Sequence, residues 1–101
     1  MIIKYRPAAI NDIEQTAEYI ENQLKNPSAA KKLKTILVTT IALLKDNPEM
    51  GMKLSDKYDV ESDYRFIIIN KQIVFYEIHS QYIEIVRVLD GRTDFLTHLF
   101  K

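Results

Sequence analysis

Two stretches in the first half of the chain carry apolar residues at helical spacing. Within residues 8–25 the apolar positions recur three or four apart and form one stripe, made of Ile10, Ile13, Ala17, Ile20 and Leu24. Asp12 and three glutamates mostly occupy the opposite side. A second stripe within residues 27–46 contains Leu33, Leu37, Ile41 and Leu44. Asn26 and Pro27 suit the N-cap and first position of that second helix, so the pattern predicts an antiparallel helical hairpin.

Runs rich in β-branched and aromatic residues predict strands on both sides of the hairpin. One run covers residues 2–5 and ends at Arg6-Pro7, because a residue before proline is pushed to extended geometry. Three more cover residues 64–70, 72–79 and 82–89, with tight turns expected at Asn70-Lys71 and Ser80-Gln81. Residues 52–63 are expected to be a loop, and residues 93–100 a short helix or an irregular tail.

The order β-α-α-β-β-β predicts an α+β fold in which the helical hairpin packs on one face of a small, mainly antiparallel sheet. With 101 residues, we expect one domain over residues 1–101. Apolar residues alternate onto both faces of the strands, as at Phe66 and Ile68 against Ile67 and Ile69. The second face therefore needs a cover, which is the terminal tail, a second copy or a foreign partner.

Composition narrows the function classes. Lys+Arg and Asp+Glu each number 14, so a nucleic-acid role must rest on a local patch rather than on a basic excess. Cysteine is absent, which is compatible with the reducing cytoplasm where we expect the protein. No apolar run is long enough for a signal peptide or a transmembrane helix, so no membrane role is expected.

Several segments resemble one family. The opening Tyr-Arg-Pro-Ala-Ala at 5–9, Ala-Glu-Tyr-Ile at 17–20 and the stretch at 44–51 are similar to RelE/ParE toxins of bacterial type II toxin–antitoxin systems. So are Tyr64-Arg65, the run at 73–77 and the strand at 83–89 followed by Asp-Gly-Arg. The resemblance implies a growth-inhibiting toxin neutralised by a cognate antitoxin. It also implies one of two targets, DNA gyrase for ParE-like members or ribosome-bound mRNA for RelE-like members.

Metal-free RNA cleavage would need an acid, a base and cations for the phosphate charge. The positions that match the RelE-like pattern give Arg65, Arg87 and His98 as candidate catalytic residues. The candidate phosphate- or RNA-binding residues are Lys53, Lys57 and Arg92. The alternative interpretation of Arg65 and Arg87 is that each lies along the sheet and covers apolar surface with its stem. His79 is interpreted as a surface turn residue, and Glu77 and Glu84 as solvated strand positions.

Two observations weigh against cleavage. The segment before residue 64 is acidic, which repels phosphate. A common family ending reads Arg-Val-Leu-His-Gly-Arg-Arg, whereas Asp90 and Thr93 replace its histidine and last arginine here. We therefore favour a ParE-like toxin that binds gyrase. A RelE-like mRNA endoribonuclease and an inactive fold that retains only antitoxin binding remain alternatives. No cofactor or metal site is predicted, and the assembly is either a homodimer or a toxin–antitoxin hetero-oligomer.

Overall fold

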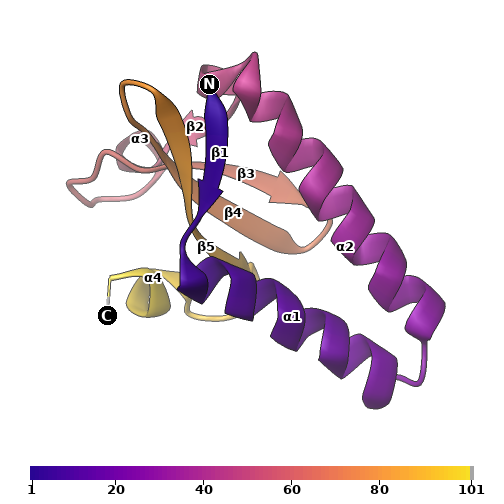
Figure 1. The fold of residues 1–101 in the computed structure, drawn as a ribbon. Coiled ribbons are helices and arrows are strands. Elements are labelled where there is room, and N and C mark those ends of the chain that lie inside the picture. The colour runs from indigo at the N-terminus through magenta and orange to yellow at the C-terminus, as the bar shows by residue number, and fades with distance from the viewer. Residues whose placement is uncertain (101) are drawn as a thin grey trace.

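One mixed sheet runs through the middle of the molecule (Figure 1). The computed structural model describes residues 1–100, and within them five strands lie in the order β1-β5-β4-β3-β2. Their bounds are Ile2–Tyr5 for β1, Met52–Lys53 for β2, Arg65–Ile69 for β3, Gln72–Ile78 for β4 and Tyr82–Asp90 for β5. β1 runs parallel to β5, and all other neighbours are antiparallel. The predicted α+β class with a mainly antiparallel sheet is confirmed.

The helical hairpin covers one face of this sheet (Figure 1). α1 spans Pro7–Asn22 and α2 spans Pro27–Ala42, which continues into the 3-10 turn η1 at Leu43–Lys45. Asn26 caps α2 as predicted, because its Oδ1 accepts a hydrogen bond from the Ala29 N–H at 3.1 Å. α1 ends before the predicted boundary at residue 25, since Lys25 has a φ of 52°, outside the helical region. None of these helices is long and apolar enough to cross a membrane.

The helical stripes are confirmed only in part. Ile13 is buried as predicted, but Ile10 and Leu24 are 50% and 58% exposed. Asp12, placed on the polar side by its charge, is 9% exposed instead. The reason is that Arg87 and a backbone N–H of β5 surround its carboxylate. A periodic pattern assigns faces by residue polarity and so misplaces a charged residue whose partner lies on another element.

The prediction of a loop over residues 52–63 is wrong at its start. β2 pairs there with β3, and the one-turn helix α3 follows at Leu54–Lys57. A second 3-10 turn, η2, spans Pro48–Met50 just before β2. A strand this short has no alternation to detect, and its pairing with Phe66 and Arg65 is set by long-range contacts. The terminal segment forms the short helix α4 at Phe95–Leu99, one of the two predicted outcomes.

Gly51 lies where the chain passes close to the sheet. A Cβ atom there would come within 2.6 Å of the Phe66 carbonyl oxygen and 2.7 Å of the Tyr76 hydroxyl. The Gly51 N–H donates to that hydroxyl at 2.9 Å, and the hydroxyl donates to the Pro48 carbonyl at 2.7 Å. Tyr76 is thus a fully buried packing residue, and its burial raises the pKa of its phenol. The hydroxyl anchors residues 48–51 to the sheet.

Both faces of the sheet are covered. The helix-side core contains Leu37, Ile41, Val74, Tyr76 and Ile85 among others. On the opposite face a second core gathers side chains from α3, α4 and the strands, including Leu54, Phe66, Phe75, Val86 and Leu99. Figure 1 shows α3 and α4 on the side of the sheet away from α1 and α2. The cover that the alternating strands demanded is therefore supplied largely by the chain itself.

Candidate functional site

Arg87 on β5 is bound to Asp12 on α1. Its Nε donates to Asp12 Oδ2 at 2.7 Å, and its Nη2 donates to Oδ1 at 2.9 Å. The Val88 N–H also donates to Oδ2 at 2.9 Å. The hydrogen bonds to Asp12 raise the pKa of the Arg87 guanidinium above its ordinary value. A forked pair of this geometry is among the strongest polar contacts in proteins, and here it ties the first helix to the last strand.

His98 lies beside this pair but contacts it through its backbone. Its carbonyl accepts a hydrogen bond from Arg87 Nη1 at 3.3 Å. Asp12, Arg87, Thr93 and His98 line one hollow at this end of β5. The structure therefore brings together two of the three candidate catalytic residues, Arg87 and His98.

Arg92 follows directly after this strand and is bound locally. It donates from Nε and Nη2 to the two oxygens of Asp90, at 2.9 and 2.6 Å. These side-chain hydrogen bonds are the main reason that the pKa of Asp90 is lowered to about 2. The Arg92 side chain is 66% exposed, so the pair is a surface contact that salt and solvent screen.

The remaining sequence candidates form a separate group. Arg65 on β3 donates from Nη1 to the Gly51 carbonyl at 2.8 Å, so its guanidinium supports the segment that Tyr76 anchors. Lys53 is its cross-strand neighbour on β2, and Lys57 lies on α3; both are exposed. In the described part of the chain, no hydrogen bond joins these residues to Arg87, Arg92 or His98.

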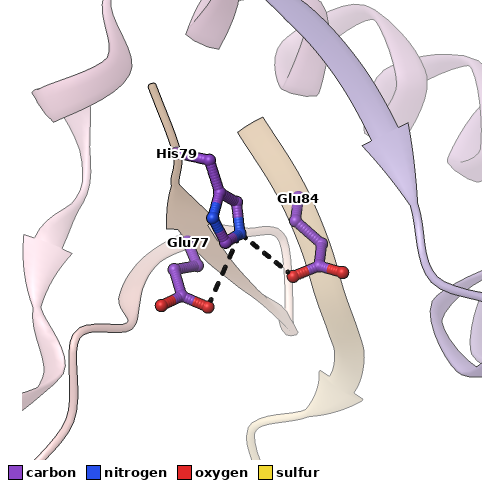
Figure 2. A group of neighbouring side chains, drawn as sticks. All are labelled: Glu77, His79 and Glu84. Atoms are coloured by element: carbon purple, nitrogen blue, oxygen red, sulfur yellow. Dashed lines mark hydrogen bonds and ion pairs between the residues drawn. The ribbon is translucent and has the colours of Figure 1, made fainter. Parts of the chain in front are cut away.

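The hairpin end of β4 and β5 carries a polar cluster that the sequence analysis missed (Figure 2). His79 Nε2 lies 3.2 Å from Glu84 Oε1 and 3.7 Å from Glu77 Oε1. Arg6, at the end of β1, holds both oxygens of Glu84, with Nε–Oε2 at 3.0 Å and Nη2–Oε1 at 3.2 Å. The hydrogen bond from Arg6 is the main cause of the lowered pKa of Glu84. The His79 ring stacks on Tyr82 with centroids 4.5 Å apart.

A signal for this cluster was present in the sequence. Residues 77 and 79 share one face of a strand because strand side chains alternate. The predicted two-residue turn at Ser80-Gln81 sets the register that places Glu84 opposite Glu77. The parallel pairing of β1 with β5, which brings in Arg6, was not contained in that local pattern. The hairpin register predicts that the three residues lie together, whereas the separate interpretations of His79 as a turn residue and of the two glutamates as solvated positions do not.

An apolar surface lies on the outer side of β1 and the helical hairpin. One groove there is lined by Ile2, Ile3, Tyr5, Val38, Ala42 and Lys45. An adjoining hollow shares Tyr5 and Val38 and adds Ile10. Ile2, Ile10 and Val38 are each at least half exposed, at 58%, 50% and 52%. β1 is also an edge strand of the sheet. Exposed apolar side chains next to an open strand edge are typical of a protein–protein interface.

A family model described as "ParE toxin of type II toxin-antitoxin system, parDE" matches residues 3–95. The chain belongs to the ParE toxin family. A search among curated proteins found no match. Among solved structures, a chain from the "Chromosomal ParDE TA system from P. aeruginosa" is similar, with a TM-score of 0.74 and 16% identity over 89% of this chain and 95% of that chain. At this identity the structural likeness concerns the fold, while the family match identifies this chain as a ParE toxin of a type II system.

Family membership confirms the resemblance inferred from the sequence and gives the unusual ending of this ParE toxin a structural context. Asp90, which stands where a common family ending has histidine, accepts the forked hydrogen bonds of Arg92. Thr93, which replaces an arginine, donates from its hydroxyl to the Asp90 carbonyl at 2.7 Å. Both replacements thus stabilise the turn after β5. They leave Arg92 as the one basic side chain of that turn, with a carboxylate already bound to it.

Proposed function

We propose that this ParE toxin arrests bacterial growth by binding a protein target, with DNA gyrase as the candidate, rather than by cutting RNA. The observation that supports this proposal is the forked bond between Arg87 and Asp12. A phosphate at Arg87 would have to displace that carboxylate or come to lie against it, and two anions at one guanidinium repel each other. Arg92 is occupied in the same way by Asp90.

The second candidate function is RNA cleavage at the ribosome, and one observation favours it. Arg87 and His98 line the same hollow, which places a cation for the phosphate charge near an imidazole that could accept the 2′-hydroxyl proton. Arg65, Lys53 and Lys57 would then act as a separate phosphate-contacting group. This function requires Asp12 to release Arg87 when RNA binds.

Neutralisation is assigned to the apolar surface beside β1. We infer that the cognate antitoxin covers Ile2, Ile10 and Val38, and extends the sheet at the edge of β1. The resulting complex is an inactive toxin–antitoxin hetero-oligomer in the cytoplasm.

The deciding experiment separates the two targets. The chain is expressed in bacteria from an inducible promoter, with and without the antitoxin gene, while DNA and protein synthesis are followed separately. The proposal expects DNA synthesis to fall first, and the purified toxin to inhibit supercoiling by gyrase. Protein synthesis falling first, with cleavage of ribosome-bound mRNA, would reject the proposal in favour of the ribonuclease. Absence of arrest with folded protein present would leave antitoxin binding as the only retained activity.

Variants make the outcome specific to residues. If mRNA is cleaved, Arg65→Ala and Arg87→Ala should abolish the cleavage. Lys32→Ala, an exposed change on α2, is the matched control and should leave cleavage unchanged. If gyrase is inhibited, neither Arg65→Ala nor His98→Ala should reduce inhibition more than Lys32→Ala does, provided that the variants are folded.

A further inference from the structure

Glu77, His79 and Glu84 converge on one point beside the β4–β5 hairpin (Figure 2). One potential ligand atom from each residue lies within 4.8 Å of the other two. All three side chains are partly buried, with exposures of 25% for Glu77, 31% for His79 and 23% for Glu84. The hairpin register fixes their backbones, because Glu77 and Glu84 are direct cross-strand partners. The convergence is therefore a property of the sheet rather than of flexible loops.

The spacing of the three atoms suits a tetrahedral metal ion. Two ligands that each lie about 2.0–2.1 Å from a zinc ion at the tetrahedral angle are about 3.4 Å apart. His79 Nε2 already lies 3.2 Å from Glu84 Oε1 and 3.7 Å from Glu77 Oε1. Small side-chain rotations of the two glutamates would complete the set. One imidazole and two carboxylates leave a fourth position for water, the arrangement of an open zinc site.

The charges around the three residues are uneven. Arg6 holds Glu84 by both oxygens, which orients that carboxylate as an outer-shell partner does in metal sites. Lys4 lies over the Tyr82 ring, 4.4 Å from its centroid, and is exposed to solvent. Within residues 1–100, Glu77 makes its ion-pair contact with His79, whose Nε2 lies 3.7 Å from Glu77 Oε1. Glu77 is thus a partly buried carboxylate without an arginine or lysine ion-pair partner in the described chain.

We propose that Glu77, His79 and Glu84 form a binding site for one divalent transition-metal ion, with zinc as the representative case. Mixed imidazole and carboxylate donors suit such ions better than they suit magnesium or calcium, which prefer oxygen ligands alone. The ion would bridge β4 and β5 at the hairpin end, and through Arg6 it would also be linked to β1. Its binding stabilises the fold by an amount that rises with the logarithm of the free metal concentration once that concentration exceeds the Kd.

The test uses the full chain without a polyhistidine tag. Isothermal titration with ZnCl₂ at pH 7.5 should show one ion bound per chain, and Co²⁺ should give the visible absorption of a tetrahedral site. His79→Ala and Glu77→Gln should each weaken zinc binding at least tenfold. His98→Ala removes the other histidine and is the matched control, which should keep wild-type affinity.

A second measurement separates ligation from a general effect on folding. Zinc should raise the thermal unfolding midpoint of the wild type and of His98→Ala, and at the same zinc concentration should raise that of Glu77→Gln by clearly less. Because protons compete with the metal for imidazole and carboxylate ligands, the zinc-induced increase should be smaller at pH 5.5 than at pH 7.5. Absence of zinc binding by the folded wild type would overturn the proposal. So would undiminished binding by the folded His79→Ala variant, since the cluster would then be an ion-pair network only.

Discussion

Two arginine–carboxylate pairs fasten β5 to its surroundings, and they differ in how completely each carboxylate is used. Asp12 receives two hydrogen bonds from Arg87 and a third from the Val88 N–H, and it is 9% exposed. Both carboxylate oxygens of Glu84 contact the Arg6 guanidinium, but Oε1 also lies within hydrogen-bond distance of His79 Nε2. The first pair is a structural joint between α1 and β5, in which both carboxylate oxygens are already hydrogen-bonded within the protein. The second is part of a larger group in which His79 and Glu77 also converge on Glu84.

This difference teaches what makes an ion pair structural. The Asp12 carboxylate lies between α1 and β5, where removing one partner leaves a buried charge without compensation. The Arg6 side chain is 41% exposed, so water replaces much of what Glu84 would lose. Burial, rather than the number of charges, separates the joint from the candidate binding group.

The largest expected effect is that of Asp12→Ala. It leaves the Arg87 guanidinium and the Val88 N–H without their acceptor, and we expect a loss of about 3 kcal/mol in the free energy of unfolding. Urea denaturation of the purified protein measures this directly. A loss below about 0.5 kcal/mol would show that the pair is not a structural joint.

The double variant Asp12→Ala/Arg87→Ala sharpens the same point. Once Asp12 is absent, removing Arg87 no longer breaks a pair and instead relieves an uncompensated charge. The combined loss should therefore be smaller than the sum of the single losses by roughly 1.5–3 kcal/mol. Urea denaturation of the four proteins in this cycle gives the coupling energy, and strictly additive losses would contradict the assignment.

A smaller effect is expected for Arg6→Ala, at roughly 0.5 kcal/mol, because the pair is partly exposed. The variant should also raise the pKa of Glu84 toward its ordinary value, since Arg6 is the main cause of the lowering. A lowered carboxyl pKa stabilises the fold above the unfolded-state pKa, and this stabilisation is lost as pH falls through the folded-state value. NMR titration of the Glu84 carboxyl carbon checks the direction, and an unchanged midpoint would rule out Arg6 as its cause.

The smallest effect is expected for Arg92→Ala, because this arginine is on the surface. The unfolding midpoint at pH 7 should not change measurably, yet the pKa of Asp90 should rise from about 2 toward its ordinary 3.8. In the wild type, the lowered pKa of Asp90 contributes to the free energy of unfolding above about pH 4, and this contribution is lost as pH falls toward 2. NMR titration of the Asp90 carboxyl carbon should find this loss shifted to higher pH in the variant. If the titration midpoint of Asp90 stayed near pH 2 in the variant, Arg92 would not be the cause of the lowered pKa.

More of the fold than of the sites could be predicted from the sequence. Local sequence features predict the order of the main helices and strands, the cap at Asn26 and the hairpin turns, because each depends on residues that are neighbours in the chain. The burial of Asp12 could not be predicted, because it depends on Arg87, which lies far along the chain and reaches Asp12 only in the folded state. β2 was missed for a similar reason, since two residues become a strand only when β3 is beside them. The Glu77–His79–Glu84 group was within reach, because the turn at 80–81 already fixed its register.

The position of β1 has a consequence for the timing of synthesis. β1 is synthesised before the helical hairpin, yet its neighbour in the sheet is β5, which begins at Tyr82. β1 therefore remains without its sheet partner until β5 has been made, and closing so long a loop is slow compared with forming the helices between them. A ribosome that stalls before residue 82 releases a fragment that cannot complete the sheet. The folded toxin thus becomes available only after β5 has been translated.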